Sequence, residues 1–163
     1  MVKKLVLIDP AGMMPRPSFP ASALNIPIIG EIMLDLFGNQ LLVQGNAKDM
    51  LHPEAFPEYT TLYQPQMTYS GFRRAVLSTF RDGMLHSKGE AYQRVGKLAL
   101  PILIVWGKED QVIPLSISDW FQKTLPNAVF KIIEQAGHVP QYELPDVVNP
   151  ILIDFIRADT FQS

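Results

Sequence analysis

Two titratable side chains stand where two apolar runs end in the second half of the chain. Asp110 follows the run in PILIVWGKEDQVIP, and His138 follows the run in VFKIIEQAGHVPQYELP. A glycine precedes each of them, which is typical of a strand that gives way to a loop. An acid and a histidine at the ends of two successive strands are two of the three groups of a Ser-His-Asp proton relay. The sequence therefore predicts that His138 acts as a general base and that Asp110 orients its ring.

The nucleophile that would complete such a relay is missing from the sequence. In the elbow motif G-x-S-x-G, the nucleophile stands two residues after a glycine. None of the 10 glycines of this chain is followed two residues later by a serine, a cysteine or an aspartate. Ser70, in Tyr-Ser-Gly, lacks the glycine before it, and we interpret it as a turn or cap residue. The sequence thus provides two members of a relay of three.

Short apolar runs predict the strands that carry the two loops. Leu5–Ile8 and Pro101–Trp106 are apolar throughout, which is typical of strands covered on both faces, and Ala128–Ile133 predicts a third strand. Ser116–Lys123 predicts a helix because Ser116 and Asp119 have the spacing of a capping box, and Pro145–Ile156 predicts a helix by its apolar face. Strands that alternate with helices in this way predict an α/β fold with a parallel sheet.

The connection between the first two strands is about 90 residues long, far more than a strand–helix–strand unit requires. It contains many prolines and no repeated strand signal, so we predict an inserted, mostly helical subdomain. Its helical candidates are Ile28–Phe37, Gln40–Leu51, Glu54–Tyr63 and Gly71–Phe80. The predicted domains are therefore an α/β core formed by residues 1-12 and 96-163 and a helical cap, or lid, formed by residues 13-95.

These motifs resemble those of a known family. PILIVWGKEDQVIP, the 28-residue step from Asp110 to His138 and AGHVPQYELP resemble the C-terminal third of an α/β-hydrolase. KKLVLIDPAG resembles the sixth strand of that fold, and GFRRAVLSTFRDG is similar to a cap helix of lid-bearing esterases, lipases and carbon–carbon-bond hydrolases. The resemblance implies a partial α/β-hydrolase fold, with about three parallel strands, flanking helices and an inserted helical cap. In that family the serine precedes the acid and the histidine, so the elbow is expected before residue 1.

The resemblance also implies a reaction. The complete enzyme would transfer an acyl group to water: an upstream serine attacks an ester-like carbonyl, His138 relays the proton and Asp110 orients His138. The isolated chain is expected to be a truncated and inactive piece. Apolar cap residues suggest a small apolar or aromatic ester-like substrate, namely Phe19, Ile28, Ile29, Ile32, Phe37, Phe72 and Phe80.

Three alternatives remain open at this point. Asp9 ends the first strand and is the alternative acid, because some haloalkane dehalogenases resemble this pattern with their acid at that strand. We favour Asp110, since Asp-Pro-Ala-Gly is more typical of a turn. The complete protein can instead be similar to a haloalkane dehalogenase or an epoxide hydrolase, with an upstream aspartate as nucleophile. The chain can also be an inactive binding module that forms homo-oligomers through the exposed strand Lys4–Asp9 or by exchange of cap elements.

Composition excludes several other classes of protein. The chain has 163 residues, of which 47% are hydrophobic and 18% charged, and this indicates one globular domain. A net charge of −2 gives no electrostatic reason to expect nucleic acid or an anionic membrane as a partner. The chain lacks cysteine, which excludes disulfides, and it lacks metal-ligand and phosphate-loop motifs. We therefore expect a cytoplasmic protein without a metal or a cofactor.

Overall fold

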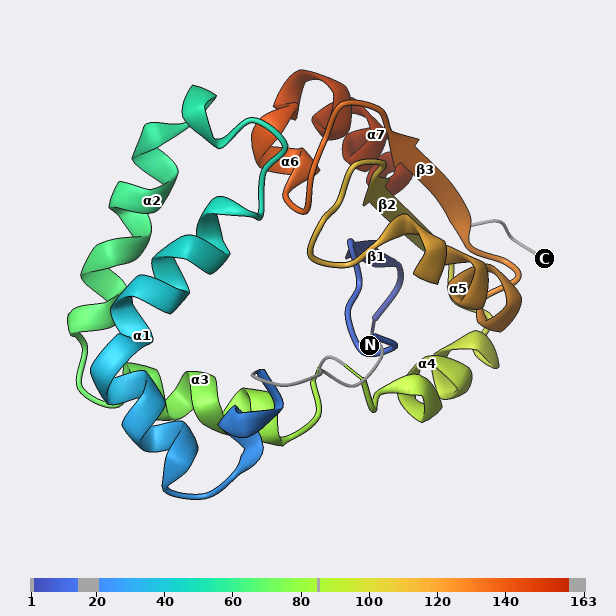
Figure 1. The fold of residues 1–163 in the computed structure, drawn as a ribbon. Helices are drawn as coiled ribbons and strands as arrows, with labels where there is room; N and C mark the ends of the chain where they lie inside the picture. Colours follow the sequence, from blue (N-terminus) through green and yellow to red (C-terminus); the bar gives the residue numbers. More distant parts are fainter. Residues whose placement is uncertain (1, 15–20, 85, 159–163) are drawn as a thin grey trace. The chain divides into compact units, whose positions relative to one another are not determined.

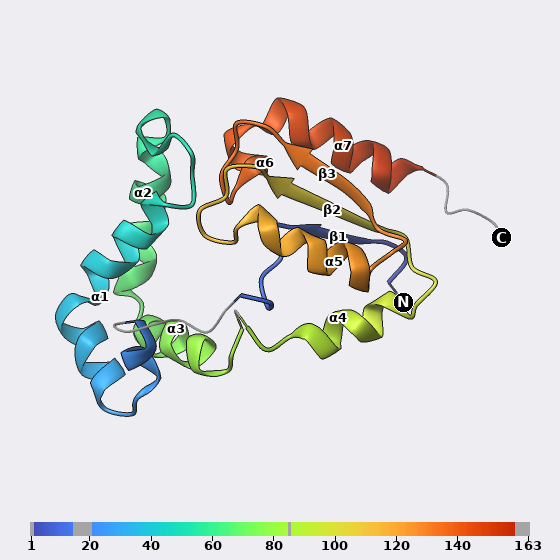
Figure 2. The same cartoon turned by 45° about the vertical axis from the view of Figure 1, so that its right-hand side comes forward.

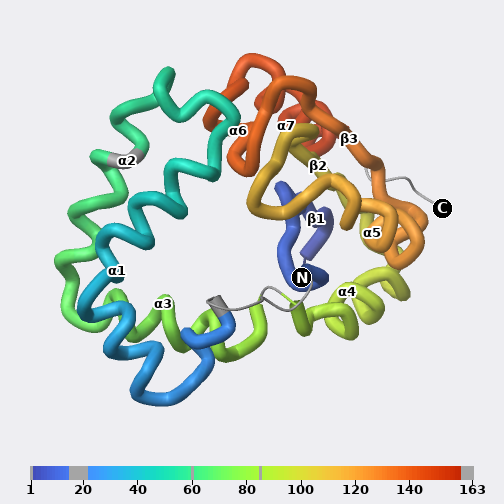
Figure 3. The backbone as a smooth tube through the Cα atoms, in the orientation of Figure 1, coloured from blue at the N-terminus to red at the C-terminus, as the bar shows by residue number. Residues whose placement is uncertain are grey.

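A computed structural model of the chain describes residues 2–14, 21–84 and 86–158. The chain forms two compact units. The first, called here the core unit, consists of Met1–Pro10, Asp49–Leu51 and Gly89–Ser163. The second, called here the helical unit, consists of Ala11–Lys48 and His52–Lys88. Figure 3 follows the chain from the first strand through the helical unit and back into the core unit.

The core unit contains a parallel sheet of three strands in the order β1-β2-β3 (Figure 1). The strands are β1 (Leu5–Ile8), β2 (Ile102–Gly107) and β3 (Val129–Ile133). Leu5 lies opposite Ile102 in the first pair, and Leu103 lies opposite Val129 in the second. All six residues of β2 are buried, which explains why its sequence is an unbroken apolar run. The predicted α/β fold with three parallel strands is confirmed.

Helices cover both faces of this sheet (Figure 2). On one face, Val148 of α7 (Pro145–Arg157) packs with Leu103 and Val105 of β2 in a buried cluster. On the other face, Phe121 of α5 (Ser118–Thr124) meets the ring of Trp106 edge to face, with 5.6 Å between the ring centroids. Successive side chains of β2 therefore point to opposite faces of the sheet, as the pleat of a strand requires.

Two helices of the core unit have no counterpart among the predicted elements. One is α4 (Gly89–Gly96), in which Tyr92 packs against Phe121 with 4.7 Å between the ring centroids. The other is α6 (Pro140–Glu143), a single turn between the loop after β3 and α7. Glycine at both ends of α4 and proline beside α6 are local signals against a helix. Both helices form nevertheless, because packing in the folded chain overrides such local signals.

The helical unit is built around α1 (Ile29–Ala47), α2 (Pro57–Tyr63) and α3 (Phe72–Arg81). Short 3-10 helices join them: Ala21–Asn25, Pro53–Ala55 and Gln64–Thr68. The prediction of two helices, Ile28–Phe37 and Gln40–Leu51, is wrong, because α1 continues through Gly38. This glycine is buried, and its Cα faces the side chain of Arg73 in α3, so the position suits a small residue within a helix.

Arg81, the last residue of α3, connects this helix to α1 within the helical unit. Its guanidinium forms a bidentate ion pair with Glu31, at 2.6 and 2.9 Å, and also donates to the carbonyl oxygens of Leu24 and Ile26. The hydrogen bonds from Arg81 lower the pKa of Glu31 to about 2, so the pair is ionised at any physiological pH.

Among the described residues, no helix is long and apolar enough to cross a membrane.

Candidate active site

Asp110 lies in the loop that follows β2, three residues after Gly107. Its carboxylate is buried, and Oδ1 accepts hydrogen bonds from the backbone N–H groups of Val112 (2.7 Å) and Ile113 (2.9 Å). These two bonds fix the side chain in a turn of the kind that aspartate favours. The other oxygen, Oδ2, remains available to a partner outside the loop.

His138 provides that partner from the loop that follows β3. Its Nδ1 lies 2.8 Å from Oδ2 of Asp110, and the imidazole is a quarter exposed whereas the carboxylate is fully buried. An ionised carboxylate has no proton to donate, so the hydrogen on this bond belongs to Nδ1. The lone pair of the neutral ring is then on Nε2, where a general base needs it.

Two glycines allow the loops of Asp110 and His138 to approach this closely. A Cβ atom on Gly107 would lie 1.8 Å from the carbonyl oxygen of Gly137, so the two backbones touch where β2 ends. The N–H of Glu109 donates to the carbonyl of Ala136 (3.1 Å), and the carboxylate of Glu109 accepts from the N–H of Ala136 (3.2 Å). The loops are therefore joined by backbone contacts as well as by the pair of side chains.

The segment Asp49–Leu51 packs against the His138 loop within the core unit. The N–H of His138 donates to the carbonyl of Asp49 (2.6 Å). Glu143 bridges both parts, because its carboxylate accepts from the N–H of Gly137 (2.7 Å) and from the N–H of Leu51 (2.8 Å). A Cβ on Gly137 would come within 2.8 to 2.9 Å of this segment's backbone, so the glycine is required for space. Residues 49–51 and Glu143 thus position the backbone of His138.

Asp9, the alternative acid, also lies at this end of the sheet. It is almost fully buried, and its Oδ1 accepts a hydrogen bond from the N–H of Gly107 (2.9 Å). One of its carboxylate oxygens lies within 4.8 Å of a carboxylate oxygen of Asp110 and of a ring nitrogen of His138. Burial, the largest cause, raises the pKa of Asp9 to about 9, and the nearby charge of Asp110 adds to this. The carboxylate that hydrogen-bonds Nδ1 of His138 is that of Asp110.

Asp9, Asp110 and His138 together also have the donor set of a metal site. Two ligands of one tetrahedral zinc ion, each about 2.0 to 2.1 Å from the metal, lie roughly 3.3 Å apart. The 2.8 Å between Nδ1 of His138 and Oδ2 of Asp110 is shorter than this and fits a hydrogen bond. The geometry of the described residues therefore favours a shared proton over a shared cation.

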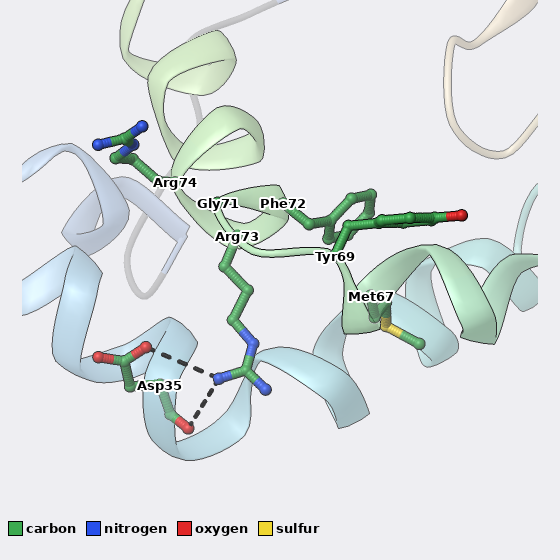
Figure 4. A pocket seen from close by; sticks show the side chains of 7 residues that line it. All are labelled: Asp35, Met67, Tyr69, Gly71, Phe72, Arg73 and Arg74. Atoms are coloured by element: carbon green, nitrogen blue, oxygen red, sulfur yellow. Dashed lines mark hydrogen bonds and ion pairs between the residues drawn. The ribbon is translucent and has the colours of Figure 1, made fainter.

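A pocket of about 310 Å³ lies in the helical unit (Figure 4). Its lining includes neither Asp110 nor His138; it consists of Asp35, Met67, Tyr69, Gly71, Phe72, Arg73 and Arg74. Figure 4 shows Arg73 turned toward Asp35, with which it forms an ion pair at 3.7 Å. Because Arg73 is already paired and no described side chain in the lining is a nucleophile with a base beside it, we assign no chemistry to this pocket.

The fold and the geometry of the Asp110–His138 pair define a hydrolase-type scaffold. The chain belongs to the alpha/beta hydrolase fold family, whose model matches residues 2–145. The resemblance seen in the sequence is thereby confirmed, and the chain corresponds to the C-terminal part of such hydrolases.

Individual relatives agree with this assignment. The uncharacterized hydrolase YugF of Bacillus subtilis (strain 168) is 26% identical over 110 residues, which are 68% of this chain and 38% of YugF. The monoacylglycerol lipase ABHD6 of Bos taurus is 33% identical over 72 residues, which are 44% of this chain and 21% of that protein. The structure of 2-hydroxy-6-oxo-6-phenylhexa-2,4-dienoate hydrolase from Rhodococcus sp. strain RHA1 aligns with a TM-score of 0.70 and 22% identity. The alignment covers 96% of this chain and 56% of that one, so the chain spans little more than half the length of this hydrolase.

Proposed function

We propose that this chain supplies the acid and the general base of a serine-type hydrolase. The observation that supports this proposal is the 2.8 Å hydrogen bond between Oδ2 of Asp110 and Nδ1 of His138, with Nε2 left as the basic atom. In the complete protein a serine outside this chain attacks an ester-like carbonyl, and Nε2 takes the serine's proton. The imidazolium, stabilised by Asp110, then gives this proton to the departing alkoxide. Water repeats the sequence on the acyl-enzyme and releases the acid.

We propose further that residues 13-95 form the cap of this enzyme and that residues 1-12 and 96-163 form its core, except that Asp49–Leu51 and the chain from Gly89 onward belong to the core unit. Four of the cap residues singled out in the sequence, Ile28, Ile29, Ile32 and Phe37, expose 72%, 45%, 52% and 55% of their surface. Exposed apolar side chains on a cap suit a small apolar or aromatic ester-like substrate. The names of two relatives, one for a monoacylglycerol and one for a phenyl-substituted dienoate, support this class. Phe19 lies outside the described residues.

The test compares p-nitrophenyl ester hydrolysis by this chain and by the complete protein. This chain alone is expected to show no turnover above the buffer rate, because its relay has no hydroxyl to activate. The complete protein is expected to be active, and His138→Ala is expected to reduce its kcat by about 10³-fold or more. Turnover by this chain alone that disappears on His138→Ala would place the nucleophile within these 163 residues.

The nature of the nucleophile decides the branch of the family. A complete protein that cleaves esters carries a serine, as proposed. Release of halide from haloalkanes, or opening of epoxides, without ester cleavage would instead assign the upstream nucleophile to an aspartate. In that case the proposed roles of Asp110 and His138 as acid and base would remain, but the reaction would change.

A second candidate function is self-association, which the free edge of β1 favours. Among the described residues, β1 pairs with β2 alone, and the N–H groups of Leu5 and Asp9 donate to β2 and to the residue before it. By the alternation of a parallel strand, the N–H groups of Val6 and Ile8 face the open edge, where another strand can pair.

We propose that the isolated chain forms homo-oligomers through this edge. Light scattering should then show a dimer or larger species that Val6→Pro dissociates, since proline removes one edge donor and leaves the bonds to β2 intact. A monomeric wild-type chain would contradict this candidate.

A further inference from the structure

Asp9 is a buried carboxyl group with one oxygen that receives no hydrogen bond from any described residue. It is only 2% exposed, and whereas Oδ1 accepts from the N–H of Gly107, Oδ2 is left without a donor. Its backbone has a φ of 42°, in the left-handed region that favours glycine. A buried polar atom without a partner and a strained backbone each cost free energy. Their coincidence at the end of β1 indicates that this carboxyl group has a task.

The groups around Asp9 determine its protonation. A carboxylate oxygen of Asp110 and a ring nitrogen of His138 each lie within 4.8 Å of a carboxylate oxygen of Asp9. Glu143 adds a further negative charge nearby. Burial first, and then the charges of Asp110 and Glu143, raise the pKa of Asp9 from its usual 3.8 to about 9, while the N–H of Gly107 lowers it. At neutral pH Asp9 is therefore a neutral acid, and its Oδ2 carries a hydrogen that it can donate.

We propose that Asp9 is a positioning residue that donates its Oδ2 hydrogen to the carboxylate of Asp110 and so holds that carboxylate against His138. This inference rests on the function proposed above, in which Asp110 is the acid of the relay. Two ionised carboxylates cannot hydrogen-bond each other, because neither has a proton. A neutral carboxyl and an ionised one form a short, charge-assisted bond.

The bond satisfies both acids. It gives the orphaned oxygen of Asp9 a partner, which removes the cost of leaving a buried polar atom unpaired. It also gives the carboxylate of Asp110 an additional hydrogen bond, besides those that its Oδ1 accepts from the N–H groups of Val112 and Ile113. The two acids take different roles: Asp110 carries the negative charge that faces the imidazole, and Asp9 stays neutral behind it.

The protonation of Asp9 can be observed directly in this chain by carbon-13 NMR of aspartate side-chain carboxyl groups. We expect one carboxyl resonance, absent from Asp9→Asn, that titrates with a midpoint near pH 9. A resonance of Asp9 that titrates below about pH 6, with the other aspartates, would overturn the proposal. This measurement uses the wild-type chain for its main result, so it does not depend on whether a variant folds.

The pH dependence of unfolding provides a second readout. The folded chain keeps the proton of Asp9 between about pH 4 and 9, whereas the unfolded chain releases it near pH 3.8. Folding therefore takes up a proton in this range, and the contribution of Asp9 to stability falls as the pH rises. The urea midpoint of the wild-type chain should accordingly fall relative to that of Asp9→Asn between pH 5 and 9, and parallel curves would contradict a neutral Asp9.

The positioning role is tested by the proton on Nδ1 of His138. We expect its downfield resonance to persist in Asp9→Asn, where the amide can still donate to Asp110, and to weaken or disappear in Asp9→Ala. An unchanged resonance in folded Asp9→Ala would show that Asp110 needs no support from Asp9. None of these readouts requires ester turnover, so the assignment of Asp9 and the proposed hydrolase function can fail separately.

Discussion

Replacing Asp110 with asparagine is expected to lower kcat/KM of the complete hydrolase by about 10³- to 10⁴-fold without unfolding it. The oxygen of the new amide can keep the bonds from the N–H groups of Val112 and Ile113, at 2.7 and 2.9 Å in the wild-type chain. Its NH₂ group then faces Nδ1 of His138. Because this NH₂ group can only donate, it forces the ring proton onto Nε2, and Nε2 can no longer accept a proton from serine.

The measurement is ester turnover by the complete protein, with circular dichroism to show that the fold is retained. Asp154→Asn is the matched control, because Asp154 is an exposed residue of α7 and its substitution removes the same charge. The control should retain turnover within about two-fold of wild type, as surface substitutions generally have small effects. If Asp110→Asn were as active as this control, Asp110 would not be the acid of the relay.

The three strands of the core unit and its helices α5 and α7 were predictable from the sequence because their residues follow recognisable patterns, whereas α4 and α6 were not. The apolar runs of β1 and β2 are short, and the glycine and proline residues beside them favour strands over buried helices. In the helical unit the sequence was less informative. Gly38 indicates a break, but α1 continues through this buried position, which faces the side chain of Arg73. Contacts between distant residues decide such positions, and a single sequence does not display them.

The site was predictable only in part, for a similar reason. Asp110 and His138 each follow a recognisable strand, and parallel strands bring their carboxyl ends to one edge of a sheet. Asp49–Leu51 acts through backbone groups, and the carboxylate of Glu143 binds backbone N–H groups of Leu51 and Gly137, so no residue type in the sequence indicates these pairings. The sequence indicates Asp9 as the alternative acid, because it ends the first strand. Its burial beside Asp110, which keeps it neutral, becomes visible only once β1 and β2 are paired.

The close approach of the two loops gives the largest expected effect on stability. Gly107→Ala places a Cβ atom 1.8 Å from the carbonyl oxygen of Gly137, and a rigid backbone offers little room to relax. We expect this substitution to reduce the free energy of unfolding by about 3 kcal/mol, the upper end of the usual cost of overpacking. It should also separate the loops and so break the hydrogen bond between Asp110 and His138. The unfolding of the core unit can be followed by the fluorescence of buried Trp106.

Gly45→Ala is the control for this substitution, because it adds the same methyl group where no atom lies within 4 Å. Gly45 lies in α1, and alanine favours a helix over glycine by roughly 0.5 to 1 kcal/mol. The control should therefore be neutral or slightly stabilising. A similar small change in Gly107→Ala would mean that the backbones of Gly107 and Gly137 do not touch. The two loops would then be held together by the hydrogen bonds between Glu109 and Ala136 and by the bond between Asp110 and His138, without close packing of the two glycines.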